Sequence, residues 1–154
     1  MASKVYFSRN IAPEIVLQLY KLVGKTLTGN IAVKVHSGEK GNQNFLRPAF
    51  WKPVVDHVGG TVTECNTAYE GPRFTTEAHM QVAKDHGFCD IAPVDIMDAE
   101  GEIQLPVKDT SRMKYNIVGS HLANYDFMIN LAHFKGHTMG GFGGVLKNQS
   151  IGVA

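Results

Sequence analysis

The amino-acid sequence predicts an α/β fold: a three-layer structure with a mostly parallel, Rossmann-like sheet and a β-hairpin insertion. Two observations lead to this prediction. Strand-like and helix-like runs alternate along the chain, which is the order that the βαβ units of a parallel sheet produce. A turn-rich tetrapeptide, Asp98–Gly101, separates two further strand-like runs and predicts the hairpin. A length of 154 residues with 44% hydrophobic residues is typical of a single globular domain, here residues 1–154.

Short runs rich in β-branched and aromatic residues predict the strands. They lie at residues 4–8, 31–35, 61–65, 115–119 and 125–134. The segments 91–97 and 102–107 flank the turn-rich tetrapeptide, so we expect them to pair with each other as the antiparallel hairpin. The other strands are expected to run mostly parallel, because helix-like segments connect them.

Proline, threonine and glycine mark the expected helix ends. The first helix is predicted to begin at Pro13 and to end before Gly24, because proline suits a first turn and glycine suits the position after the last turn. The second begins at or after Pro48 and ends at Gly59–Gly60. Pro53 favours the later start, since proline is tolerated only in a first turn. Two further helices are predicted from Thr75 or Thr76 to about Gly87 and over Phe142–Ile151.

Composition limits the function classes. The formal net charge of +1 argues against a broad nucleic-acid surface, and no stretch approaches the roughly 20 apolar residues of a membrane span. The N-terminus lacks the apolar core of a signal peptide. Cys65 and Cys89 are the two cysteines, which fits free thiols in a reducing cytoplasm and excludes a self-contained four-cysteine iron–sulfur site. We therefore expect a cytoplasmic protein with neither nucleic acid nor membrane as a partner.

The segment His133–Asn148 carries the densest set of chemically active groups, with two histidines, two lysines and five glycines. It follows a largely apolar run, so we expect a glycine-rich turn that leads from a strand to a helix. Backbone N–H groups at such a point bind anions. The predicted cofactor-binding residues are Gly140, Gly141, Gly143, Gly144, Lys147 and Asn148. The spacing excludes a phosphate-binding P-loop, because Asn148 stands where Ser or Thr would follow the lysine.

Polar residues also follow other predicted strands. His36 ends the second strand, Cys65–Asn66 ends the third, and the late strand leads into Lys135 and His137. Ligands of open parallel sheets bind at the carboxyl ends of the strands, so we expect these loops, together with the loop 121–124, to converge on one edge. This edge is predicted to bind a small anionic ligand or a metal ion.

Side chains at this edge are assigned roles, each with an alternative. Candidate metal ligands are His36, His133 and His137, because neutral imidazole is a common metal ligand. His133 is equally compatible with a packed histidine in the core. Candidate catalytic residues are His137 and His121 as bases and Lys147, since a lysine whose pKa is lowered by burial can form covalent adducts. Lys147 could instead be a solvated helix lysine, and the glycines could serve only turns and helix packing.

Several motifs together resemble one known family. They are Val33–Glu39, Gly41–Asn44, Glu64–Thr67, Asp85–Gly87, Ile91–Ile96, Gly119–Asn124, His133–His137, Gly140–Gly144 and Lys147–Asn148. They extend over nearly the whole chain and resemble the domain-of-unknown-function family three-six-two (DUF362), whose members are often described as iron–sulfur-centre proteins. The resemblance implies that this chain is the N-terminal portion of a longer architecture. It also implies that an iron–sulfur cluster would belong to a downstream, cysteine-rich domain and not to these residues.

The segment Gly141–Lys147 is also similar to the glycine-rich, lysine-containing region of the lactate racemase family. That resemblance implies a metal–organic cofactor, a nickel pincer nucleotide, tethered to Lys147, with His137 or His121 as the base. Two function classes therefore stand side by side. One is an iron–sulfur-associated binding module for an anionic ligand or metal, completed by a second copy of the chain or by a C-terminal domain. The other is a racemase- or isomerase-like enzyme.

Overall fold

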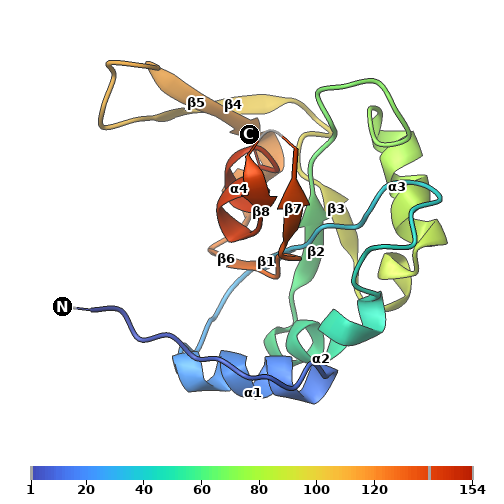
Figure 1. Cartoon of the computed structure of the whole chain (residues 1–154). Coiled ribbons are helices and arrows are strands. Elements are labelled where there is room, and N and C mark those ends of the chain that lie inside the picture. The colour runs from blue at the N-terminus through green and yellow to red at the C-terminus, as the bar shows by residue number, and fades with distance from the viewer. Residues whose placement is uncertain (1, 139, 154) are drawn as a thin grey trace.

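A four-stranded parallel sheet forms the centre of the computed structural model, which describes residues 2–138 and 140–153 (Figure 1). Its strands lie in the order β3–β2–β1–β6, and each neighbouring pair is parallel. Their bounds are Ile31–Lys34 for β1, Thr61–Glu64 for β2, Val94–Ile96 for β3 and Phe127–Asn130 for β6. Helices cover the sheet and a separate antiparallel hairpin extends from it, which confirms the predicted three-layer α/β class.

One face of the sheet is covered by helices that precede or connect its first three strands. They are α1 (Pro13–Val23), α2 (Pro48–Val58) and α3 (Thr76–Asp85), the last followed by the short 3-10 helix η1 (Phe88–Asp90). Ile31, Val33 and Val35 alternate along the chain and point to this face. They pack with Trp51 and Val54 of α2 in the main hydrophobic core. Within the described residues, none of the helices is both long and apolar enough to cross a membrane.

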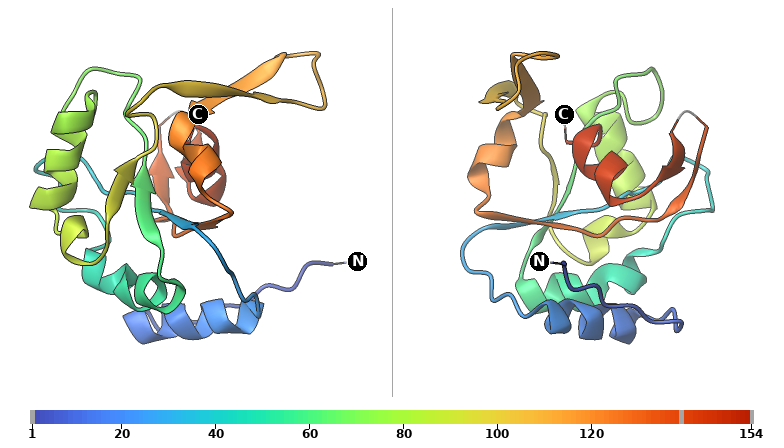
Figure 2. Two further views of the ribbon diagram at one scale, coloured as in Figure 1. Left: turned by 180° about the vertical axis from the view of Figure 1, so that it is seen from behind. Right: turned by 60° about the vertical axis from the view of Figure 1, so that its left-hand side comes forward.

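The opposite face of the sheet is covered by α4 (Val145–Ser150) and the 3-10 helix η2 (Ser120–Asn124) (Figure 2). A smaller apolar cluster lies on this side, formed by Cys65, Met97, Val118 and Val153. The strands also turn Lys34 and Thr63 to this face, since side chains alternate along a strand. This second layer is therefore more polar than the first and can accommodate charged groups next to the sheet.

The ends of α1, α2 and α3 confirm the sequence predictions, with one exception. Gly24 and Gly59 end α1 and α2 with φ angles of 69° and 62°, in the left-handed conformation that glycine adopts at low cost. The Thr75 hydroxyl accepts a hydrogen bond from the N–H of Ala78 and caps α3. The exception is Pro53, which lies inside α2 and not in its first turn. The carbonyl that loses its partner lies one turn earlier, at an exposed position where water can replace the missing N–H.

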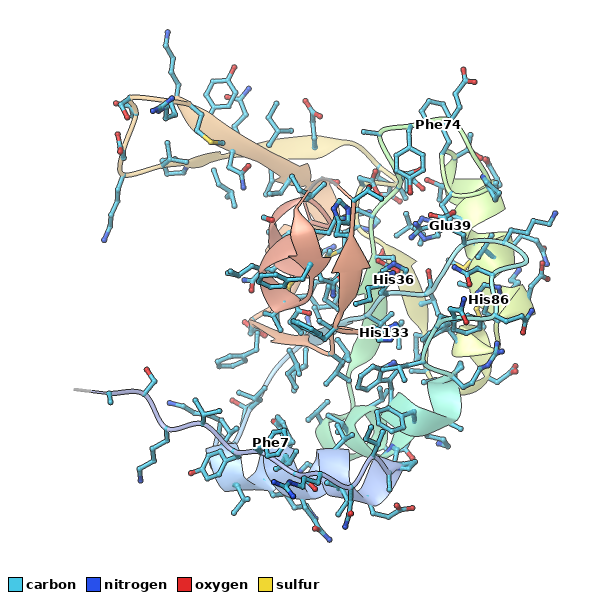
Figure 3. All side chains as sticks on the ribbon, in the orientation of Figure 1. Phe7, His36, Glu39, Phe74, His86 and His133 are labelled. Carbon is cyan, nitrogen blue, oxygen red and sulfur yellow. The ribbon has the colours of Figure 1, made fainter. Side chains whose placement is uncertain are left out.

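The predicted strand at residues 4–8 is wrong. This segment has no regular secondary structure, and Val5 and Phe7 are 86% and 79% exposed. It runs alongside α1 and away from the sheet, with Phe7 next to that helix (Figure 3). β-Branched and aromatic residues favour an extended chain, but a strand also needs a neighbour for its backbone hydrogen bonds, and this segment reaches none.

The β-hairpin insertion is present, but one of its two strands is not the predicted one. β4 (Glu102–Pro106) pairs with β5 (Tyr115–Gly119), and this hairpin projects from the body of the molecule (Figure 2). Residues 94–96, which were expected to pair with β4, form β3 and join the parallel sheet. Ile96 and Met97 are at most 1% exposed, so burial against the sheet outweighs the local turn signal that follows them.

The glycine-rich segment forms a second, smaller hairpin before α4. β7 (Lys135–His137) pairs antiparallel with β8 (Gly141–Gly143). The predicted strand at 125–134 is therefore shorter, because only β6 belongs to the sheet. The predicted helix at 142–151 is also shorter, because its first residues belong to β8 and α4 begins at Val145. Pairing between β7 and β8 turns the chain back over the edge of the sheet, where the site is found.

Candidate functional site

The strand order opens a crevice at one end of the sheet. From β1 the chain passes outward to β2 and then to β3, whereas β6 lies on the other side of β1. After β1 the chain turns toward α2 on one face, and after β6 it turns toward α4 on the other. Such a switch point leaves space at the carboxyl ends of the strands, where ligands of α/β sheets bind. The structure has a cavity of about 600 Å³ here.

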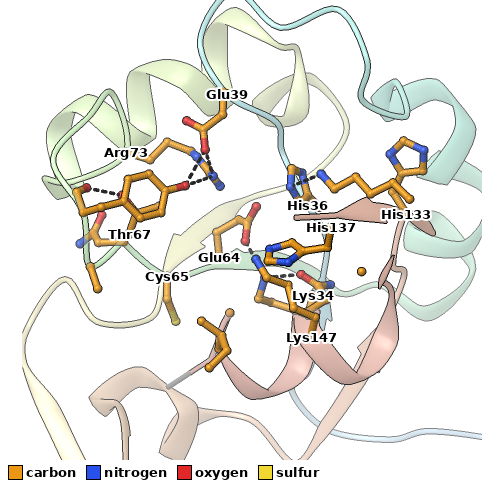
Figure 4. Close-up of a pocket in the computed structure, with 18 of the residues that line it drawn as sticks. Lys34, His36, Glu39, Glu64, Cys65, Thr67, Arg73, His133, His137 and Lys147 are labelled. Atoms are coloured by element: carbon orange, nitrogen blue, oxygen red, sulfur yellow. Dashed lines mark hydrogen bonds and ion pairs between the residues drawn. The ribbon is translucent and has the colours of Figure 1, made fainter. Parts of the chain in front are cut away.

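The cavity is lined by the segments that follow β1, β2 and β6 and by α4 (Figure 4). Its charged residues and histidines are Lys34, His36, Glu39, Glu64, Arg73, Asp98, His133, Lys135, His137 and Lys147. The predicted convergence of loops on one sheet edge is confirmed for all of them except the loop 121–124. A volume of this size suits a small molecule and is too small for a macromolecule.

A buried ion pair between neighbouring strands lines the cavity. Lys34 is 1% exposed, and its Nζ donates hydrogen bonds to Glu64 Oε2 at 2.5 Å and to Asn148 Oδ1 at 3.1 Å. The other carboxylate oxygen of Glu64 accepts from the N–H of Ser37 at 2.7 Å. Burial alone would raise the pKa of Glu64, but the Lys34 ammonium lowers that pKa to about 2, so the carboxylate is ionised. The pair joins β1, β2 and α4 at the site.

A second ion pair lies in the loops after β1 and before α3. Arg73 is 7% exposed and pairs through Nη2 with Glu39 Oε1, and the Tyr69 hydroxyl donates to the same oxygen at 2.9 Å. Burial would raise the pKa of Glu39, but the Arg73 guanidinium outweighs burial and lowers it. Arg73 Nε is buried and has no hydrogen-bond partner within the described part of the chain. The two charges therefore neutralise each other and leave one N–H donor unsatisfied.

Lys135 of β7 contacts His36 at the end of β1, with 2.7 Å between Nζ and Nε2. The N–H of Gly38 donates to His36 Nδ1 at 3.1 Å. Burial lowers the pKa of His36 to about 4, so the ring is uncharged at neutral pH. Burial also lowers the pKa of Lys135, and the positive charges of Lys147 and Arg73 lower it further. Lys135 thus lies in a positive environment, which penalises its own charge.

The structure brings most of the predicted residues of the glycine-rich segment to the cavity. Those that line it are His133, His137, Gly143, Gly144, Lys147 and Asn148. Asn148 is fixed by its neighbours: Oδ1 accepts from Lys34 Nζ, and Nδ2 donates to Asn130 Oδ1 at 2.8 Å. His137 Nδ1 accepts from the N–H of Gly140 at 3.1 Å. The side chain of Lys147 is exposed at the mouth of the cavity.

Three predicted residues lie elsewhere. Gly140 belongs to the turn between β7 and β8, and Gly141 is the first residue of β8; neither lines the cavity. His121 lies in η2, where its Nδ1 is 2.8 Å from Asp95 Oδ1 and its Nε2 is 3.4 Å from Glu100 Oε2. The hydrogen bond to Asp95 raises the pKa of His121. The structure therefore separates His121 from the cavity and gives it a carboxylate environment of its own.

The three predicted metal ligands, His36, His133 and His137, all line the cavity. Residues 2–138 and 140–153 contain no group of three or more His, Cys, Asp or Glu side chains placed to hold a metal ion. Both ring nitrogens of His36 contact protein groups, Gly38 and Lys135. His133 differs, because its Nδ1 is buried without a hydrogen-bond partner among the described residues. A metal ion at these histidines stays a prediction.

Sequence reasoning missed the ion pairs that shape the cavity. Lys34 interrupts an otherwise apolar strand, and Glu64 ends a β-branched run. Each is a usable signal, because a charge inside a buried strand requires a partner of opposite charge. Arg73 and Glu39 lie in loops, where no periodicity marks them. Lys135 lies within the glycine-rich segment singled out from the sequence. Its contact with His36 depends on how β7 folds back over the sheet, which the local sequence pattern does not encode.

These features define an α/β domain whose parallel sheet carries a cationic cavity at the carboxyl ends of its strands. The chain belongs to the DUF362 family, described as "Domain of unknown function (DUF362)", whose family model matches residues 31–154. This match confirms the family predicted from the sequence motifs. The matched range, residues 31–154, contains every strand of the parallel sheet and the whole lining of the cavity. No curated protein and no solved structure matches the chain.

Proposed function

We propose that this domain binds a small anionic ligand in the cavity, between Lys135 and Lys147. The observation that carries the proposal is a charge imbalance in the lining. The cations Lys34 and Arg73 are neutralised by carboxylates. By contrast, no ion pair joins Lys135 or Lys147 to a carboxylate within residues 2–138 and 140–153. An anion placed between these two lysines would supply the missing negative charge.

The remaining groups of the lining support an anion over a cation. Asp98, the acidic residue outside the two ion pairs, already accepts a hydrogen bond from the N–H of Asn66 at 2.9 Å. Burial lowers the pKa of Lys135 most, and the positive charges of Lys147 and Arg73 lower it further, so these cations contribute positive potential at Lys135. Such a potential attracts an anion and repels a free metal cation. The cavity volume of about 600 Å³ limits the ligand to a small molecule.

Calorimetric titration with oxalate, a small dianion, tests the proposal. We expect saturable binding by the wild-type chain. Lys135→Ala and Lys147→Ala should each weaken binding about tenfold or more, because a hydrogen bond to a charged group contributes about 1.5–3 kcal/mol. Lys21→Ala removes an exposed lysine from α1, on the other side of the sheet, and should leave the affinity unchanged. Added salt should weaken binding, since it screens the attraction.

Two results would contradict this proposal. One is the absence of saturable binding of both oxalate and inorganic phosphate to a wild-type chain that circular dichroism shows to be folded. The other is an equal loss of affinity in Lys21→Ala and in the two cavity variants, which would indicate binding to any surface lysine. A parallel titration with Zn²⁺ in the absence of oxalate tests the alternative prediction of a metal site, for which His133→Ala and His137→Ala are the matched variants.

A further inference from the structure

We propose that Lys135 is a covalent attachment site, whose amine condenses with the carbonyl group of a small 2-oxo carboxylate to form an imine. Lys147 holds the carboxylate of the same molecule. The inference rests on the proposed function, because it presupposes that an anionic ligand binds in the cavity and specifies the chemical class of that ligand. It adds a bond-forming role for Lys135, whereas charge alone requires only that this lysine attracts the ligand.

The ring of His36 determines how the lysine amine is used. A backbone N–H can only donate, so the contact from Gly38 N makes His36 Nδ1 an acceptor. An uncharged imidazole has a single N–H, which then lies on Nε2. That nitrogen faces Lys135 Nζ at 2.7 Å. A hydrogen bond from this N–H requires a lone pair on Nζ, so the contact favours the uncharged amine, which is the nucleophilic form of lysine, over the ammonium form that attracts an anion.

The backbone holds this arrangement in place. Gly38 has a φ of 86°, in the left-handed region, and a Cβ at this position would lie 2.9 Å from Phe45 Cβ. Glycine is therefore required where the chain turns to aim its N–H at the ring. The ring of Phe45 also stacks on His86, whose Nδ1 is 2.7 Å from the Ser37 carbonyl oxygen. The turn after β1 is thus fixed on both sides, which fixes the orientation of His36.

The position of Lys147 selects the class of carbonyl compound. Lys147 lies in the same lining as Lys135, near enough that its charge lowers the pKa of Lys135. In a 2-oxo carboxylate the carboxylate carbon is bonded directly to the carbonyl carbon. A carboxylate held by Lys147 therefore keeps the adjoining carbonyl carbon inside the cavity that Lys135 also lines. A neutral aldehyde or ketone gains nothing from Lys147.

The proposed step balances without an oxidant or a reductant. Lys135 Nζ forms a bond to the carbonyl carbon, the C=O π bond breaks, and a carbinolamine results. The hydroxyl group then leaves, and the C=N bond forms as the nitrogen loses its second hydrogen. The carbonyl oxygen departs as one water molecule that carries both hydrogens of the amine. His36 Nε2 is the group at hydrogen-bonding distance from Nζ that can give a proton to the hydroxyl and regain one from the nitrogen.

Reductive trapping tests the proposal. The full chain is incubated with pyruvate and sodium cyanoborohydride, digested, and mapped by mass spectrometry. We expect one dominant adduct on Lys135, with the mass of pyruvic acid less one oxygen atom. Lys135→Arg leaves a cationic side chain that can attract an anion but removes the primary amine, so it should abolish the adduct. His36→Phe should slow trapping about a hundredfold, the usual contribution of a proton-transfer group. Lys147→Ala should raise the pyruvate concentration needed for half-maximal trapping about tenfold.

Oxalate binding, measured on the same samples, separates the failure of this inference from the failure of the proposed function. Oxalate carries no ketone that can condense with an amine. If oxalate binds but pyruvate modifies all lysines at similar rates, or none, covalent attachment is wrong and anion binding stands. If neither oxalate nor pyruvate is bound, both proposals fail. Trapping of acetone as efficient as that of pyruvate would overturn the role given to Lys147.

Discussion

Lys34 and Glu64 join β1 to β2 through a pair of charges that water hardly reaches, with side chains 1% and 5% exposed. Glu64→Gln removes the negative partner and leaves the ammonium buried. We expect the free energy of unfolding at pH 7 to fall by about 3 kcal/mol, measured by urea denaturation. Asp56→Asn, which breaks the exposed pair with Lys52 on α2, is the control and should cost about 0.5 kcal/mol or less. A loss in Glu64→Gln no larger than in the control would contradict the expectation.

The same pair has a defined pH dependence. The pKa of Glu64 is about 2 in the folded chain against 4.5 ordinarily, because the attraction of Lys34 exceeds the effect of burial. Its stabilisation is therefore complete above pH 4.5 and is lost as the pH falls toward 2. The stability difference between the wild type and Glu64→Gln should narrow over that range.

His36 affects stability at higher pH than Glu64 does. Its pKa is about 4 in the folded chain instead of 6.5, so the free energy of unfolding of the wild type should fall as the pH is lowered from 6.5 to 4.

Residue identities alone predicted which loops meet, but not which side chains pair. The convergence of His36, the loop after β2 and the segment after β6 follows from parallel strands, whose carboxyl ends lie together. The pairing of Arg73 with Glu39 depends on two loops of irregular conformation. The placement of His121 failed for a related reason: η2 lies beside β3, and Asp95 attracts the ring there. These contacts join residues far apart in the sequence, so no local pattern encodes them.

The base of the β4–β5 hairpin depends on a close approach between two elements. β5 ends at Gly119, where a Cβ would lie 2.5 Å from the carbonyl carbon and oxygen of Met97. Gly119→Ala should therefore destabilise the fold by about 2 kcal/mol, because the backbone of 97–98 would have to shift. Gly71→Ala is the matched control, since its Cβ meets no atom within 4 Å, and should change stability by about 0.5 kcal/mol or less. Equal midpoints in thermal denaturation of the two variants would refute this account.

Elements with local signals were predicted well, and elements that depend on distant partners were not. Pro13 and Gly24 delimit α1, and the cap at Thr75 starts α3, because each signal acts within one helical turn. The predicted partner of β4 was wrong. The strand-like segment nearest to it in the sequence, residues 94–96, pairs with β2 in the parallel sheet, and β4 pairs with β5. Residues 4–8 had the composition of a strand but no strand to pair with.

Two parts of the molecule lie outside the three layers: the segment before α1 and the β4–β5 hairpin (Figures 1 and 2). The hairpin loop 107–114 contains the exposed residues Lys108, Arg112 and Lys114. Limited digestion with trypsin should cut in this loop and in the segment 2–12 first. Lys34 and Arg73, 1% and 7% exposed, should be cut only after global unfolding. Mass spectrometry of the early fragments checks this, and early cleavage after either buried residue would contradict the layered arrangement.

The pairing of β1 with β6 also governs how the chain acquires its structure. Residue 31 pairs with residue 127, so the centre of the sheet is closed by contacts between segments far apart in sequence. Such contacts form late, because a long loop must close before they are gained. During synthesis on the ribosome, β1, β2 and β3 emerge with their helices before β6 does. One edge of β1 therefore has no partner strand until β6 has been synthesised. Until β6 arrives, that edge is open to other extended chains, and the cavity lacks Lys135, Lys147 and Asn148. Ligand binding and full protection of this strand edge are thus acquired together, once β6 has joined the sheet.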